Sequence, residues 1–141
     1  MDLAYKASLK RWALDHLSQR IATTTEAMRD AQDAANSEEK SSAGDKYETG
    51  RAMGHLQKDM HARQLAELVR ELAALHAVKE VVLRMGHLDF FIGIGLGKQM
   101  IEGRAVVFLS PQAPLALTLR SKKTGDSVVF QGETLTISEI F

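Results

Sequence analysis

Apolar positions in residues 1–77 recur at alternating spacings of three and four, which is the pattern of a helical seam. The segment 36–44 interrupts this pattern with residues that cap or break helices. The pattern predicts two helices of about 33 residues each, joined by a polar turn, in an antiparallel hairpin roughly 50 Å long. The first seam consists of Leu14, Leu17, Ile21, Thr24, Met28, Ala31 and Ala35. The second consists of Met53, Leu56 and Met60 and, after a step of five, of Leu65, Leu68, Leu72 and Leu75.

The predicted seam weakens toward the turn, where small or polar side chains replace the leucines. Close packing of alanines can hold two helices together, but we expect this end to be the least stable part of the hairpin. Two interpretations fit such an element: a narrow finger that is inserted into a partner, or a coiled coil that dimerises. The side chains concerned are Thr24, Ala27, Ala31, Ala34 and Ala35.

Residues 78–141 have the pattern of a small β-sheet, with β-branched and aromatic runs such as VVL, FFIGI, VVF and LTI. The segment 110–119 predicts a short helix, with Ser110 as N-cap and Pro111 in its first turn. A turn is expected at 122–126 and a tight hairpin at 131–133. The fold class that follows is α+β, a helical hairpin plus a small sheet domain with one helix. Strands are expected at about 79–85, 89–96, 104–109, 126–131 and 133–139.

Composition divides the chain at the same place. Residues 1–77 contain no proline and three glycines, whereas residues 78–141 contain both prolines and seven glycines. We therefore expect two domains, 1–77 with its tip at about 36–45, and 78–141.

Charge and composition exclude several classes of function. The 18 basic residues balance the 18 acidic ones, which argues against direct sequence-specific binding to DNA. The absence of cysteine excludes disulfides, thiolate metal sites and thiol nucleophiles. The N-terminal residues lack an apolar leader, and no apolar run is long enough to span a membrane. We expect a cytoplasmic protein without membrane contact.

The run Ser110-Pro-Gln-Ala-Pro-Leu-Ala-Leu-Thr-Leu-Arg-Ser-Lys-Lys-Thr-Gly-Asp-Ser-Val-Val-Phe130 resembles the C-terminal signature of Gre-type transcription elongation and cleavage factors. The family pattern is approximately S-x-x-S-P-[LI]-[AG]-x-x-L-[LI]-G-K-x-x-G-D-x-V, followed by a strand hairpin. Ala113 stands where the family often has serine, and Ser121 where it usually has glycine. The resemblance extends to the layout, since Gre factors have an N-terminal antiparallel coiled-coil hairpin and a C-terminal FKBP-like domain.

This resemblance implies that the protein binds bacterial RNA polymerase. In the family the globular domain docks at the rim of the secondary channel, partly through the segment that matches Ala113, Pro114 and Leu115, and the finger passes down the channel. Lys122 and Lys123 are expected in a turn, which is either simply exposed to solvent or contacts an acidic partner at this rim. Acidic residues at the family's tip help to hold a second Mg²⁺, which the polymerase uses to cleave backtracked RNA. The resemblance thus implies an accessory factor that is not itself an enzyme, with no cofactor of its own and Mg²⁺ shared with the polymerase.

The tip departs from the family pattern. If Tyr47 is aligned with the family's tyrosine, the two acidic positions fall on Lys40 and Ala43, and neither can bind a metal. Asp45 and Glu48 are the candidates for sharing Mg²⁺, because carboxylates are the ligands this ion prefers. Alternatively, both stand in the first turn of the second helix only because the helix dipole favours acids there. The full set of candidate tip acids is Glu38, Glu39, Asp45 and Glu48.

Two other features invite a functional interpretation. The segment 93–98, Gly-Ile-Gly-Leu-Gly-Lys, lacks the spacing of a phosphate-binding loop and is interpreted as a bulge or tight turn between strands. The five histidines show no metal-binding spacing.

The hypothesis that follows is a monomeric RNA polymerase-binding factor that modulates elongation or transcript cleavage. The alternative is a coiled-coil interaction module that dimerises and has no activity on polymerase.

Overall fold

The structure is a computed structural model that describes residues 3–39 and 44–141, with their side chains except those within 37–52 and at 54 and 55. No helix among these residues is both long enough and apolar enough to cross a membrane.

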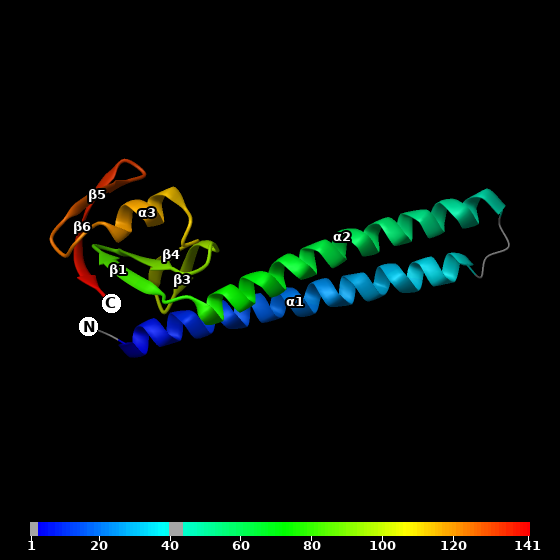
Figure 1. Cartoon of the computed structure of the whole chain (residues 1–141), viewed down its shortest axis with the longest axis horizontal. Helices are drawn as coiled ribbons and strands as arrows, with labels where there is room; N and C mark the ends of the chain where they lie inside the picture. Colours follow the sequence, from blue (N-terminus) through cyan, green and yellow to red (C-terminus); the bar gives the residue numbers. More distant parts are fainter. Residues whose placement is uncertain (1–2, 40–43) are drawn as a thin grey trace. The chain divides into compact units, whose positions relative to one another are not determined.

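The fold is α+β, with two long helices followed by a six-stranded mixed sheet (Figure 1). Helix α1 spans Leu3–Glu39 and helix α2 spans Gly44–Ala77. Asn36–Glu39 is therefore helical, although the sequence pattern predicts a turn that starts at Asn36. The chain forms two compact units: Asp15–Ala73, and the residues up to Leu14 together with Ala74–Phe141. Each long helix thus contributes residues to both units.

In the helical unit, burial follows the predicted seam of α1. Leu17, Ala31 and Ala35 are buried, and the remaining seam residues between them are partly buried. On α2, Leu68 is buried and Leu65 and Leu72 are partly buried, as the pattern predicts.

The seam does not include the earlier part of α2. Met53, Leu56 and Met60 are 52%, 54% and 52% exposed, so the prediction that they are buried in the seam is wrong. Their spacing places them on one face of the helix, but spacing alone cannot determine whether another surface covers that face.

The second unit is built on a sheet with the strand order β3-β4-β2-β1-β6-β5. The β2–β4 pair is parallel, and the other four pairs are antiparallel. One short helix, α3 (Pro114–Arg120), lies between β4 and β5 along the chain. The strands are β1 (Val81–Met85), β2 (Leu88–Ile92), β3 (Gly97–Ile101), β4 (Arg104–Leu109), β5 (Ser127–Phe130) and β6 (Glu133–Ile140).

Every residue of β2 is buried, because both faces of the sheet are covered. On one face Phe90 packs in the core that includes Leu119 of α3. Successive side chains of a strand point to opposite faces, so Phe91 faces the other way. There its ring lies 5.2 Å from Phe108, and Phe108 in turn stacks on Trp12 of α1 with a ring distance of 5.3 Å. The first turns of α1 therefore form part of the core of the sheet unit.

The structure corrects the predicted end of the second strand. That strand was expected at 89–96 but ends at Ile92, and the following glycine segment connects it to β3. A Cβ atom on Gly93 would lie 2.7 Å from the ring of the buried Phe91, so only glycine fits at this point. The segment is a connection between strands that are not neighbours, since β4 lies between β2 and β3.

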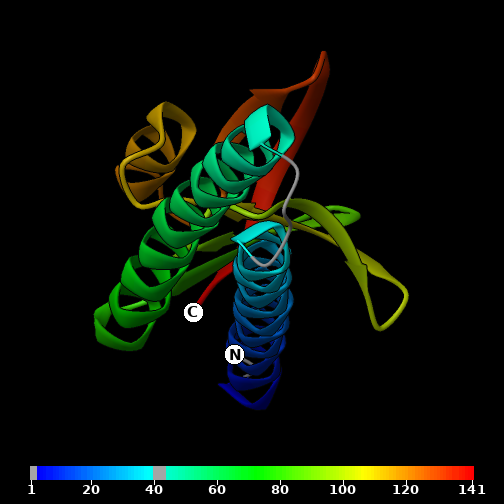
Figure 2. The same ribbon diagram turned by 90° about the vertical axis from the view of Figure 1, so that its right-hand side faces the viewer.

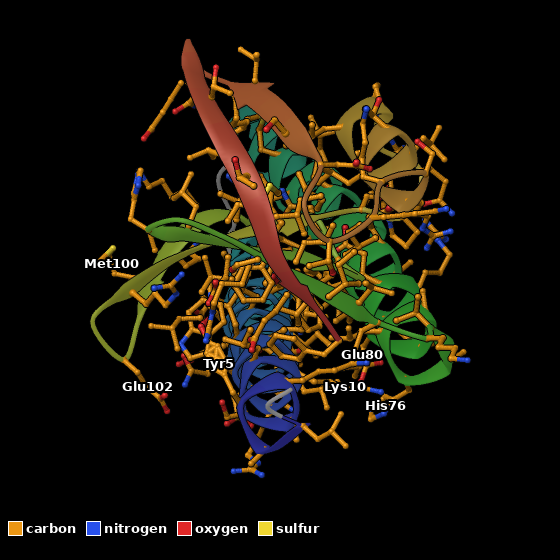
Figure 3. All side chains as sticks on the ribbon, turned by 90° about the vertical axis from the view of Figure 1, so that its left-hand side faces the viewer. Tyr5, Lys10, His76, Glu80, Met100 and Glu102 are labelled. Carbon is orange, nitrogen blue, oxygen red and sulfur yellow. The ribbon has the colours of Figure 1, made fainter. Side chains whose placement is uncertain are left out.

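Strand β3 was not expected. It forms a hairpin with β4 around Glu102 and Gly103, and this hairpin projects from the rest of the sheet (Figures 2 and 3). By contrast, the predicted hairpin at 131–133 is confirmed. Gln131 and Gly132 both have positive φ, 51° and 79°, as a two-residue turn of type I′ requires.

The predicted start of the short helix is also corrected. The helix begins at Pro114 instead of directly after Ser110, and its N-cap residue is Ala113, which makes no side-chain capping bond. The Ser110 hydroxyl accepts a hydrogen bond from the backbone N–H of Gln112, so it stabilises a turn before the helix. Pro114 occupies the first helical position, where a backbone N–H would have no acceptor within the helix, so proline loses no hydrogen bond there.

Candidate functional site

Helix α3 presents one face to the core and one to solvent. Ala116 and Leu119 lie on the face toward the core and are buried. Pro114 is exposed, and Leu117 is 58% exposed although it is a large apolar residue. We call Pro114 and Leu117 the outer face of α3.

The three residues of the predicted docking segment differ in exposure. Pro114 is exposed, whereas Ala113 and Leu115 are partly buried and pack against the core cluster beneath the helix. Leu117 was not among the predicted residues. Its one sequence signal was its place three residues after Pro114, on the same side of a helix.

The two predicted lysines follow α3 in a tight turn. The carboxylate of Asp126 accepts a hydrogen bond from the backbone N–H of Lys123, and Gly125 has a φ of 96°, which favours glycine. Lys123 is exposed, and Lys122 is partly buried. The predicted turn at 122–126 is thereby confirmed, and it holds both lysines directly after the helix.

The candidate tip acids lie at the ends of the two long helices. Glu38 and Glu39 are the last residues of α1, and Asp45 and Glu48 belong to the first turns of α2. The side chains of all four lie outside the described residues, as do Lys40 and Ala43 altogether. Among the described residues, no three side chains of histidine, aspartate or glutamate are grouped as metal ligands would be.

One charged residue is buried in the core of the described chain, namely Asp89 of β2. Its carboxylate accepts four hydrogen bonds. Tyr5 Oη donates to Oδ2 over 2.7 Å, and Arg104 Nε donates to the same oxygen over 2.8 Å. Arg84 donates from Nε to Oδ1 over 3.0 Å and from Nη2 to Oδ2 over 3.2 Å. Arg104 also donates to the carbonyl of Gly86 over 2.7 Å, which fixes its orientation.

The electrostatics of this cluster keep Asp89 ionised. Burial alone would raise the pKa of Asp89, but the hydrogen bonds from Arg84, Arg104 and Tyr5 outweigh burial and lower that pKa. The pKa of Tyr5 rises to about 12, first because burial disfavours the phenolate and second because the phenol donates to Asp89. The hydrogen bond to Asp89 raises the pKa of Arg84. A carboxylate that is ionised, buried and saturated with donors is suited to hold structure together and unsuited to transfer protons.

The cluster fastens the start of α1 to the sheet. Tyr5 bonds to Asp89 and receives the guanidinium of Arg84 over its ring, 5.0 Å from the centroid. Five residues later on α1, Lys10 pairs with Glu80 over 3.3 Å, and Figure 3 shows these two side chains together. Tyr5 and Trp12 thus both attach the first turns of α1 to the sheet, Tyr5 by its hydrogen bond to Asp89 and Trp12 by its stacking on Phe108.

The sequence pattern does not predict the Asp89 cluster, although it contains a signal for the pairing of Arg84 with Asp89. Arg84 and Asp89 stand symmetrically about Gly86 and His87, and a two-residue turn there makes them direct cross-strand partners. The strands predicted at 79–85 and 89–96 leave three residues for the turn between them. A turn with an odd number of residues does not place Arg84 opposite Asp89. Tyr5 is 84 residues away from Asp89 in the sequence, and no local pattern connects the two.

The comparisons with known proteins identify no relative: no family model, no curated protein and no solved structure matches this chain.

We predict that Asp89→Asn lowers the free energy of unfolding by about 3 kcal/mol, because two arginines then lose their buried counter-charge. Tyr5→Phe, which removes one hydrogen bond, should lower it by about 1 kcal/mol. Urea unfolding followed by the fluorescence of Trp12, the sole tryptophan, measures both. Asp30→Asn is the matched control, since this carboxylate is exposed on α1. A value for Asp89→Asn equal to that for Asp30→Asn would contradict the structural role of the cluster.

Proposed function

We propose that this protein is an RNA polymerase accessory factor of the Gre-like type. In this proposal α1 and α2 form an antiparallel coiled-coil finger that enters the secondary channel, and residues 78–141 are an FKBP-like docking domain. The factor has no catalytic activity of its own and acts by modulating elongation or by completing the polymerase's RNA cleavage site.

The observation that carries the proposal is the outer face of α3. The motif that resembles the Gre signature falls on this helix and on the turn after it. Pro114 and Leu117 expose apolar surface there, and Lys122 and Lys123 follow directly. Exposed apolar residues beside charged ones are a common composition of protein interfaces. This face therefore supports a docking role for the helix.

The dimensions of α1 and α2 also support a finger. With 37 and 34 residues, they extend over about 55 and 50 Å at 1.5 Å per residue. The charged residues of 33–48, five acids and two lysines, give the proposed tip a net charge of −3. Such a tip is suited to approach bound metal ions, since Mg²⁺ prefers carboxylate oxygens.

The alternative, a dimerising module, is favoured by the exposed side chains of Met53, Leu56 and Met60. It requires a stable dimer, which light scattering detects. It gives no role to the outer face of α3 or to the lysine turn, and for this reason we prefer the polymerase-binding function.

Pro114→Ala/Leu117→Ala should weaken binding to bacterial RNA polymerase about tenfold or more, because it truncates both apolar contacts of the outer face. Binding is measured by titrating labelled protein with core polymerase. Val129→Ala is the matched control, since Val129 is 68% exposed on β5 and is not part of the outer face of α3. Leu115 is left unchanged because it packs against the core. Equal affinities of the wild type and the double variant would contradict the docking role.

If the tip acids share Mg²⁺ with the polymerase, the wild type should stimulate RNA cleavage in backtracked complexes. Asp45→Ala/Glu48→Ala should reduce this stimulation about tenfold or more while leaving polymerase binding intact. Glu26→Ala/Asp30→Ala is the control, because these acids are exposed in the middle of α1. Full stimulation by Asp45→Ala/Glu48→Ala would contradict the metal role and leave the helix dipole as the reason for both acids.

A further inference from the structure

A hollow of about 230 Å³ lies on the face of the sheet that α3 covers, beside the C-terminal end of this helix. The helix has only seven residues, which at 1.5 Å per residue extend over roughly 10 Å. Beside its end, the sheet residues Val81 and Ile140 are only partly buried. The apolar lining consists of Val81, Leu83, Ile92, Leu119 and Ile140.

The solvent side of this hollow is cationic. Arg120 and Lys122 complete the lining; Arg120 is exposed and Lys122 is partly buried. Neither has an ion pair with any residue that the structure describes, and no acid lines the hollow. The helix dipole favours a cation at Arg120, but Lys122 lies beyond the last turn. The surface that complements this arrangement is an apolar group with carboxylates beside it.

The size of the hollow limits what it can bind. Small-molecule sites usually enclose about 300 to 1,000 Å³, so this hollow is small for a cofactor or a drug-sized ligand. A single leucine or phenylalanine side chain has a volume of the right order for this hollow. Interfaces commonly anchor themselves by such a side chain in a pocket, with charged groups around it.

We infer that this hollow receives one apolar side chain of the polymerase, presented on a segment whose neighbouring aspartates or glutamates pair with Arg120 and Lys122. The inference rests on the proposed function and deepens it. Arg120 belongs to the same helix as Pro114 and Leu117, so a partner that covers the outer face of α3 reaches the hollow as well. Docking then uses two adjacent sites, an exposed apolar face and a pocket with a cationic rim.

Two variants test the two halves of this site. Val81→Phe fills the hollow from its partly buried wall, and it should weaken polymerase binding about tenfold or more. Val129→Phe is its matched control, because it adds the same ring at an exposed position on β5.

Arg120→Gln/Lys122→Gln should weaken binding at about 50 mM salt and much less at about 300 mM, because salt screens the attraction that these cations provide. Lys98→Gln/Arg11→Gln removes two exposed cations elsewhere and should leave the salt dependence unchanged.

The outcomes separate this inference from the proposed function. If Val81→Phe and Arg120→Gln/Lys122→Gln bind as the wild type does, while Pro114→Ala/Leu117→Ala is weakened, the inference is overturned and the proposed function stands. If the charge variant alone is weakened and a folded Val81→Phe is not, insertion of an apolar side chain is overturned. If the wild type does not bind polymerase, both fail. Should Val81→Phe not fold, the salt dependence of Arg120→Gln/Lys122→Gln decides, and an unchanged dependence overturns the inference.

Discussion

The buried carboxylate of Asp89 is the interaction on which the sheet unit depends most, because three other elements donate to it. Tyr5 comes from α1, Arg84 from β1 and Arg104 from β4. An ionised carboxylate in a core is strongly unfavourable unless it is paired and hydrogen-bonded, so the position requires all its donors at once. The aromatic contact of Trp12 with Phe108 adds apolar burial to the same attachment. The first turns of α1 are therefore part of the sheet unit, although residues 15–73 separate them from it along the chain.

This attachment assigns different roles to the two faces of the sheet. One face is occupied by the first turns of α1, and the other by α3. In the proposed function, α3 and the lysine turn contact the polymerase, and the opposite face carries the helix that continues into the finger. The proposed docking residues and the Asp89 cluster share no side chain, so the proposed contacts at α3 involve none of the charges that hold α1.

Much of the fold could be predicted from the sequence where the information is local. The two long helices follow from their spacing, and the turn at Gln131 and Gly132 from its residue types. Strand β3 was missed because Gly97, Lys98 and Gln99 are poor strand formers, and only pairing with β4 makes them a strand. The exposure of Met53 was missed because a repeat identifies a shared face and does not identify what covers it.

The candidate site shows the same limit. The motif located α3 and the lysine turn, but only packing distinguishes the inward Leu115 from the outward Leu117. The hollow beside Arg120 is lined by residues of α3 and of three strands that are far from it in the sequence, so no local pattern predicts it. The partnership of Tyr5 and Asp89 is a contact between distant segments, and composition assigns Tyr5 to the helical part.

Hydrogen exchange along α1 shows whether the start of this helix belongs to the sheet unit. Amides of residues 7–14 should exchange as slowly as those of β2, through opening of the whole unit, and more slowly than amides of residues 18–36. Exchange of residues 7–14 at the rates of residues 18–36, with β2 still protected, would contradict it.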